Sequence, residues 1–565
     1  MLVDIGSDVR RLVTRLTARQ CTLLAAGSML VVILVPLRGL LLRQGGPMEE
    51  GFMLVFGEQF LHGMVPNKDF LYLYGPGGVW VLAGVFKVFG VSLLAERLVA
   101  LAQLLGIIFG VFILVLRAWG RILAVVGGTI TALIILPPIA LTDLAWNGAV
   151  AFALFGIITG IGSTRARTTR GANGLAIASG ALFGMAMLYR PDLVIASVLV
   201  AMFLLPHLTR AARKRELLAW AAVLSLYLVQ IAMAGLHNSI QGMIIDPVFN
   251  LRGGRGLPVP PSFHQFQSFL QLAGERGALK WPIPDIKAPA QLTVWFLLLV
   301  CVVVALALVA WWFRRRERES LRSFTLMLVA AFSVGILPQA LQRPDTTHVA
   351  WVSCVPFAFV PVAAVEVLRA WRPSLSPTRL LAGGIVPFVA FLYLAIPNYT
   401  LRDYADVSAQ TFGLHRASFE IKNDGRDFYA GRRSVQVQLT QILKLADKIS
   451  KPGQRLFVGT GDLRKTPYSD AFIYFLLPHL TPATYYIEMD PGLANAPGSR
   501  LATDVASANI VILSRVWDVW NEPNDSRVFG SEKPNDVLKK SFCTIKNDPL
   551  YVLLQRCAHG NAPVP

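Results

Sequence analysis

Two adjacent carboxylates, Glu49 and Glu50, follow the first strongly apolar segment of the chain. A carboxylate at a membrane surface can act as a general base on a hydroxyl group. Ionisable groups at a membrane boundary cost free energy unless they are paired or wetted, so their presence there indicates function. The same stretch continues with polar residues before a Gly-Pro-Gly turn, namely Asn67, Lys68, Asp69, Tyr72 and Tyr74. We therefore predict a proton-transfer site; the alternative for the glutamates is a solvated helix start favoured by the helix dipole.

Two Arg-Pro-Asp turns follow later apolar segments and add cations to this prediction. They are Arg190-Pro191-Asp192 and Arg343-Pro344-Asp345, and the second continues to His348. Proline ends each helix, which places Arg on its last turn and Asp just beyond it. Arg can hold a phosphate bidentately and stabilise the charge of a leaving phosphate. A base, cations and an apolar groove suit a lipid-phosphate-linked substrate; the alternative is that Arg and Asp pair as interface anchors.

The composition is that of a membrane protein. Of 565 residues, 54% are hydrophobic and only 15% charged, and the mean hydropathy is +0.53. These values exclude an ordinary soluble protein of this size. The net charge of +19 is divided among clusters between apolar segments, so we expect no nucleic-acid partner.

Eleven apolar segments have roughly the length needed to cross a bilayer. The first follows a basic N-terminus, lacks a cleavage site and is predicted to stay uncleaved. Alternate loops carry the Arg and Lys clusters, which predicts a multi-pass plasma (inner) membrane protein with residues 1–20 in the cytoplasm and the C-terminal region outside. The predicted segments lie near 21–42, 92–116, 122–141, 147–163, 173–189, 192–208, 217–235, 291–313, 323–341, 349–368 and 380–396.

The predicted transmembrane domain spans 21–397, with outer loops at 43–91 and 236–290. Residues 76–90 are too short to cross and predict an interfacial helix. The Gly- and Pro-rich 236–290 loop, which contains Arg252-Gly-Gly-Arg255, is either a flap over the site or a linker.

Residues 398–565 are predicted to form an outer α/β domain with a small, largely parallel sheet. We expect a helix at 435–449 and strands at 455–458, 485–487, 509–513 and 550–554. Cys543 and Cys557 flank the last strand. In an oxidising compartment they can form a disulfide, and two free buried thiols are the alternative.

The outer loop resembles that of a known family. Met48-Glu-Glu-Gly-Phe52, Leu61-His-Gly-Met-Val-Pro66, Asp69-Phe70, Tyr74-Gly-Pro-Gly77 and Phe86-Lys-Val-Phe-Gly90 are similar to the first outer loop of GT-C membrane glycosyltransferases. The branch is that of protein O-mannosyltransferases and lipid A aminoarabinose transferases. The resemblance covers roughly residues 20 to 400 in architecture, and its motifs are concentrated in 48–90.

The resemblance implies inverting transfer of a sugar from a polyprenyl-phosphate donor to a cell-envelope glycan, lipid or protein. Glu49 occupies the position of the family's usual catalytic Asp, but because Glu is longer, the base can be Glu49 or Glu50. Some relatives use a divalent metal, although the sequence contains no cluster that demands one. The implied donor-phosphate ligands are Arg190 and Arg343, with Lys68 and His348 in support, Asp345 as an orienter or sugar ligand, and Asp69, Tyr74 and Asp192 in the substrate region.

Two other classes of function are open. A flippase for polyprenyl-linked glycans would also have many helices and outer arginines, but transporters usually bury polar groups near the midplane and show related halves. A non-catalytic envelope assembly protein would tolerate the loss of both glutamates.

Overall fold

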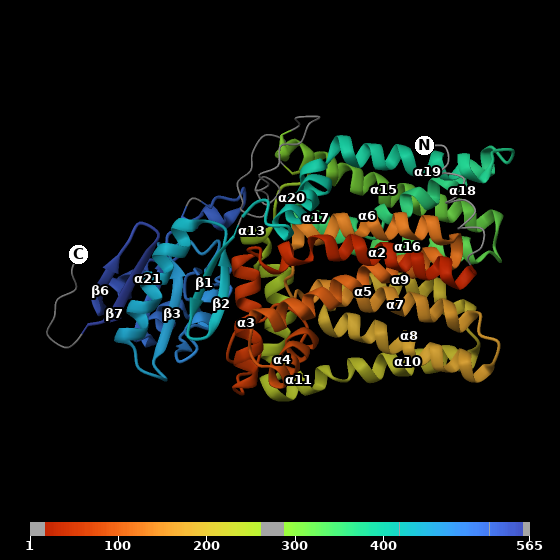
Figure 1. Ribbon diagram of the computed structural model, residues 1–565. Helices are drawn as coiled ribbons and strands as arrows, with labels where there is room; N and C mark the ends of the chain where they lie inside the picture. Colours follow the sequence, from red (N-terminus) through yellow and green to blue (C-terminus); the bar gives the residue numbers. More distant parts are fainter. Residues whose placement is uncertain (1–16, 262–286, 417, 519, 558–565) are drawn as a thin grey trace.

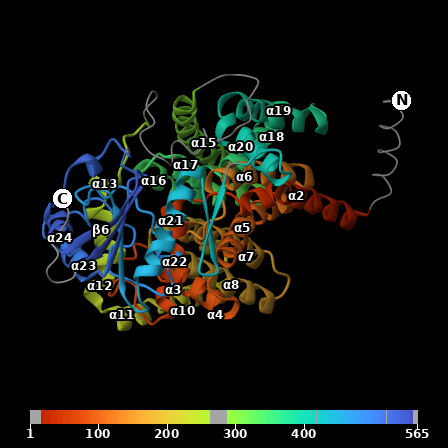
Figure 2. The same ribbon diagram turned by 60° about the vertical axis from the view of Figure 1, so that its left-hand side comes forward.

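The computed structural model describes residues 17–261, 287–416, 418–518 and 520–557. Figure 1 shows a long bundle of helices with a smaller sheet-containing domain at one end, and Figure 2 shows the two in contact. The helices α3 and α4 lie where the two parts meet.

Ten spans within the described residues are long and apolar enough to cross a membrane. In lipid only helices satisfy every backbone polar group within a single segment, and these match ten of the eleven predicted crossings. The spans are α2 (Ala18–Leu41), α5 (Leu93–Trp119), α6 (Arg121–Ile139), α7 (Ala145–Thr164), α8 (Thr169–Tyr189), α10 with α11 (Arg210–Leu224, Tyr227–Ala234), α15 (Ala288–Arg316), α16 (Leu321–Gln342), α17 with η5 and α18 (Thr346–Ser353, Phe357–Phe359, Val360–Trp371) and α19 (Pro377–Ala395).

The eleventh predicted crossing, 192–208, is a shorter apolar helix over Pro191–His207. It consists of η1 (Pro191–Leu193), α9 (Val194–Leu204) and η2 (Leu205–His207). Pro191 lines a cavity at one end of the bundle. His207 Nε2 lies 2.7 Å from Arg314 Nη2, in the basic last turn of α15. The helix therefore runs between the two ends of the bundle, as the longer helices do.

The basic loops meet at the end of the bundle opposite the cavity. Trp119 donates to Glu366 at 2.7 Å, and Arg322 pairs with the same carboxylate at 3.1 Å. Arg165 donates to the Glu319 carbonyl at 3.1 Å. These contacts bring together loops that the alternating charge pattern predicts to share one side.

The predicted outer loop 43–91 contains two helices. α3 (Pro47–Leu61) begins with Pro47, which suits a first helical position, and carries Glu49 and Glu50 in its first turn. The predicted interfacial helix is α4 (Gly77–Phe89), which at 13 residues is too short to span.

The predicted outer loop 236–290 continues from the bundle as α12 (Leu236–Ile240), η3 (Gln241–Asn250) and α13 (Arg252–Arg255). Residues 262–286 of the predicted flap lie outside the described residues.

The C-terminal region begins with η6 (Pro397–Tyr399) and α20 (Leu401–Thr411). The α20 helix packs on the first membrane helix, because Tyr404 Oη donates to the Val32 carbonyl at 2.6 Å and Gly39 N donates to Thr411 Oγ1 at 2.8 Å. The outer domain is therefore anchored to the bundle from its start.

The outer domain has a β1–β2 hairpin and a five-stranded sheet in the order β4-β3-β5-β7-β6. β4, β3 and β5 are parallel, while β7 is antiparallel to both β5 and β6. The elements are β1 (Phe419–Asn423), β2 (Arg426–Ala430), α21 (Arg433–Ile449), β3 (Arg455–Thr460), α22 (Phe472–Leu476), β4 (Thr481–Pro482), α23 (Leu501–Ser507), β5 (Ile510–Ser514), η7 (Asp525–Arg527), α24 (Lys533–Ser541), β6 (Phe542–Asn547) and β7 (Tyr551–Arg556).

Two details of this domain differ from prediction. The sheet is mixed, because a short connection joins β6 to β7 and makes them antiparallel. The predicted strand 485–487 lies outside the strands. The backbone of this segment instead contacts the residues before α4, since the Tyr485 carbonyl accepts a hydrogen bond from Leu71 N at 2.8 Å.

A disulfide joins Cys543 to Cys557, across a sequence separation of 14.

Candidate active site

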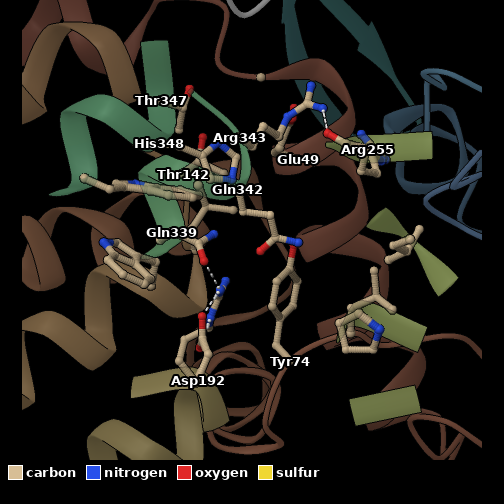
Figure 3. A pocket seen from close by; sticks show the side chains of 18 of the residues that line it. Glu49, Tyr74, Thr142, Asp192, Arg255, Gln339, Gln342, Arg343, Thr347 and His348 are labelled. Carbon is tan, nitrogen blue, oxygen red and sulfur yellow. Dashed lines mark hydrogen bonds and ion pairs between the residues drawn. The ribbon is translucent and has the colours of Figure 1, made fainter. Parts of the chain in front are cut away.

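A cavity of about 640 Å³ lies between one end of the bundle and the C-terminal domain. Its walls come from α3, the α8–η1 and α16–α17 turns, η3 with α13, and residues 488 and 490 of the outer domain. Figure 3 shows Glu49, Arg255, Arg343 and His348 near one another, with Tyr74 and Asp192 across from them. Segments distant in the sequence therefore bring acids and cations to one enclosed space.

Glu49 lines this cavity from the first turn of α3. Tyr468 Oη donates to Glu49 Oε2 at 2.7 Å. Burial raises the pKa of the Glu49 carboxyl, while the Tyr468 hydrogen bond and the charge of Arg255 oppose part of that rise. A raised pKa makes this carboxylate a better proton acceptor near neutral pH than an exposed glutamate.

Glu50 is fully buried and is not among the residues that line the cavity. Its carboxylate accepts from Arg97 Nε at 2.7 Å and from Arg97 Nη2 at 2.9 Å. Arg97 also donates to the backbone carbonyls of Leu41 and Arg43. Burial raises the pKa of Glu50, and Arg97 opposes that rise. Of the two glutamates, the geometry gives Glu49 access to a substrate and Glu50 an ion pair.

Arg190 faces the cavity at the end of α8. Its Nε and Nη2 donate to Asp192 at 2.9 and 2.7 Å. The guanidinium lies over the rings of Tyr74 and Trp146, 5.2 and 5.3 Å from their centroids. These contacts fix the plane of the group, and Nη1 makes no hydrogen bond to any described residue. Arg190 can therefore still donate to a phosphate.

Arg343 lines the same cavity, but its donors are engaged by protein groups. Nε donates to Asp345 Oδ2 at 2.8 Å, and both terminal nitrogens bind the Glu522 carboxylate. Nη1 also donates to the Arg255 carbonyl. In this arrangement Arg343 connects the α16–α17 turn to the outer domain.

Asp345 contacts both Arg343 and His348 from its buried position. Its Oδ1 lies 2.8 Å from His348 Nδ1, which orients the imidazole that lines the cavity. Burial raises the pKa of Asp345, but His348 and Arg343 outweigh it and lower the pKa to about 2. Asp345 is therefore a permanent anion at neutral pH.

Two predicted binding residues do not line the cavity. Lys68 is exposed, and Asp69 Oδ2 accepts from Val65 N at 2.8 Å within a tight turn. Asn67 has a positive φ of 66° in this turn. Asp69 therefore stabilises the turn in which it lies, whereas Tyr74 lines the cavity.

Several cavity residues were not predicted from the sequence. Arg255, from α13, donates to Asp490 Oδ1 at 2.8 Å. Gly254 permits this approach, because a Cβ there would lie 2.2 Å from the Pro491 carbonyl oxygen. The Arg-Gly-Gly-Arg pattern was a visible signal for Arg255, but Glu488 and Asp490 lie in a region that resembles any soluble domain.

Metal ligation does not fit the described side chains. Among them, no group of three or more His, Cys, Asp or Glu residues is arranged to hold an ion. We therefore derive no step through a metal.

No known protein-family profile matches the sequence, and no curated protein matches it. The fold is similar to that of ArnT from Cupriavidus metallidurans bound to undecaprenyl phosphate, with a TM-score of 0.51 and 14% identity over 97% of this chain and 100% of that one. An Archaeoglobus fulgidus oligosaccharyltransferase tethered to an acceptor peptide aligns with a TM-score of 0.47 and 11% identity over 94% of this chain and 74% of that one. The full-length match to ArnT shows that this multi-pass membrane protein has the GT-C fold. Its described residues contain ten candidate spans and a C-terminal sheet-containing domain.

Proposed function

We propose that the protein is an inverting glycosyltransferase that moves a sugar from a polyprenyl-phosphate donor to a glycan, lipid or protein of the cell envelope. The observation that carries this proposal is that Glu49 and Arg190 line the same cavity at one end of the bundle. The ArnT structure with undecaprenyl phosphate supports a donor of this class in the same fold.

In the proposed reaction the acceptor hydroxyl attacks the anomeric carbon on the face opposite the phosphate. The bond between that carbon and the phosphate oxygen breaks, and the phosphate leaves with the bonding electron pair. Glu49 takes the hydroxyl proton as general base. Arg190 and Arg255 supply positive charge to the leaving phosphate, and His348 offers a further donor.

The proposed topology places the N-terminus in the cytoplasm and the cavity at the outer face of the plasma membrane. The transmembrane domain covers 21–397 and the outer domain 398–565. The arginine-rich loops at the opposite end of the bundle support this orientation.

The test is sugar transfer in sealed proteoliposomes of the full chain, supplied with radiolabelled polyprenyl-phosphate sugars of defined anomeric configuration and with envelope extracts as acceptor. We expect one donor to be consumed, free polyprenyl phosphate to appear in equal amount, and the product to have the opposite anomeric configuration. Movement of an intact donor across the bilayer without cleavage would instead support the flippase reading. A retained configuration would contradict attack from the opposite face.

A further inference from the structure

The hydroxyl of Tyr468 lies between two groups at the start of α3. It accepts a hydrogen bond from Met48 N at 3.0 Å and donates one to Glu49 Oε2 at 2.7 Å. Tyr468 belongs to the outer domain, 419 residues from Glu49 along the chain. The outer domain therefore contacts Glu49, the general base of the proposed reaction.

The Tyr468 ring is held by two tryptophans of the same domain. Its centroid lies 4.4 Å from that of Trp517 and 4.9 Å from that of Trp520, the latter stacked. The Tyr468 side chain is fully buried. A ring packed in this way has few alternative rotamers, so the hydroxyl is fixed relative to its domain.

The helix that carries Glu49 is in turn fixed to the outer domain. A Cβ on Gly51 would lie 2.4 Å from Phe472 N, so only glycine permits this approach of α3 to α22. Farther along α3, Glu58 pairs with Arg426 at 2.6 Å. One buried apolar cluster includes residues of α3, α4, α22 and β3. The contact between Tyr468 and Glu49 is therefore part of a continuous packed interface.

We propose that the outer domain completes the active site, with Tyr468 as the positioning residue that holds the Glu49 carboxylate toward the acceptor hydroxyl. This inference rests on the proposed function and assigns that domain a part in the reaction itself.

The charged groups around Glu49 come from several elements. Arg255 on α13 lowers its pKa, and Asp345 before α17 raises it. Glu488, in the outer domain, has its pKa raised by burial, and the negative charge of Glu49 adds to that rise. On α3 itself, Glu50 is paired with Arg97. Tyr468 donates a side-chain hydrogen bond to Glu49.

Removal of the Tyr468 hydroxyl is expected to raise the pKa of Glu49, because the hydrogen bond favours the ionised form. The base works only when ionised, so activity falls as the pH drops through that pKa. The free energy of a hydrogen bond to a charged group corresponds to a shift of about one to two pH units. The acidic limb of the pH profile should move upward by that amount.

The experiment compares Tyr468→Phe, which keeps the ring, with Tyr474→Phe in full-length protein in proteoliposomes. Tyr474 is a matched control, because it is a buried tyrosine of the same domain whose hydroxyl accepts from Val458 N at 2.8 Å and which does not line the cavity. Transfer rate, donor KM and thermal midpoint are measured across pH. We expect Tyr468→Phe to shift the acidic limb and lower kcat with little change in donor KM, and Tyr474→Phe to keep the wild-type limb.

An unshifted limb in Tyr468→Phe would overturn the inference, as would an equal loss in both variants without a shift, which would mean a folding role only. Carboxyl absorption in the infrared, taken as the difference between each protein and its Glu49→Gln counterpart, reports the Glu49 titration without turnover. The pKa of Glu49 measured in this way must be higher in Tyr468→Phe than in wild type, even if wild type transfers no sugar. Failure of the proposed function is therefore distinguished from failure of the inference.

Discussion

The buried pair of Glu50 and Arg97 predicts a stability role for the second glutamate of the outer loop. The change that tests it is Arg97→Met, which leaves the Glu50 carboxylate fully buried without its cation. Two carbonyls, of Leu41 and Arg43, also lose their donor. We therefore expect a large loss of stability.

The size of that loss follows from the environment of the pair. The side chains of Arg97 and Glu50 are 2% and 0% exposed, so solvent screens their attraction little. Removal of one partner of such a pair costs about 3–5 kcal/mol, while native stabilities are about 5–15 kcal/mol. The double variant Glu50→Leu with Arg97→Met leaves no unpaired charge, so its loss should be smaller than the sum of the single losses.

The assay is the apparent thermal midpoint in detergent of wild type, both single variants and the double variant. Lys68→Met serves as control, because Lys68 is exposed and such changes usually shift stability by less than about 0.5 kcal/mol. A wild-type midpoint in Arg97→Met, or strictly additive losses in the double variant, would refute the assignment of Glu50 to a structural pair.

Two further predictions concern the outer domain and its junction with α3. Gly51→Ala should separate α3 from α22 and lower both the thermal midpoint and the rate of sugar transfer. The control Gly84→Ala, where a Cβ meets nothing within 4 Å, should leave both unchanged or raise the midpoint slightly. Equal midpoints in the two variants would contradict the close approach of α3 to α22. Serine at both Cys543 and Cys557 should lower stability by about 3 kcal/mol, the value for a loop of about 15 residues, yet preserve transfer below the unfolding temperature because neither residue lines the cavity. Loss of sugar transfer in a double-serine variant that is still folded would contradict this prediction and would mean that the disulfide is needed for activity.

The bundle was predictable because its signals are local. A helix in lipid must be apolar over its whole length, and the charge alternation identifies the side of each loop. The sequence also indicated that Glu49 and Arg190 lie beyond the ends of apolar segments, and their roles in the reaction stay predictions. The segment 192–208, which was also predicted to cross, forms the shorter apolar helix Pro191–His207.

The partners of these residues were not predictable from the sequence. Packing of the outer domain on the bundle brings Tyr468 to Glu49, 419 residues apart in the sequence. The same packing brings Glu522 to Arg343, across 179 residues. Lys68 and Asp69 were predicted as binding residues, but neither lines the cavity, and Asp69 accepts a hydrogen bond from the backbone of its own turn. Sequence alone could not separate Glu49 from Glu50 either, because the first turn of a helix points neighbouring side chains in different directions.

The most direct test of the account is sugar transfer by Glu49→Gln measured beside donor-lipid binding in the same proteoliposomes, with Glu532→Gln, a half-exposed carboxylate on the outer domain, as control. We expect Glu49→Gln to bind donor like wild type and to lose transfer by about 10²–10⁴-fold, the contribution of a general base, while the control transfers normally. Wild-type transfer by Glu49→Gln would contradict the assignment of the base and, with it, the proposed chemistry of the cavity.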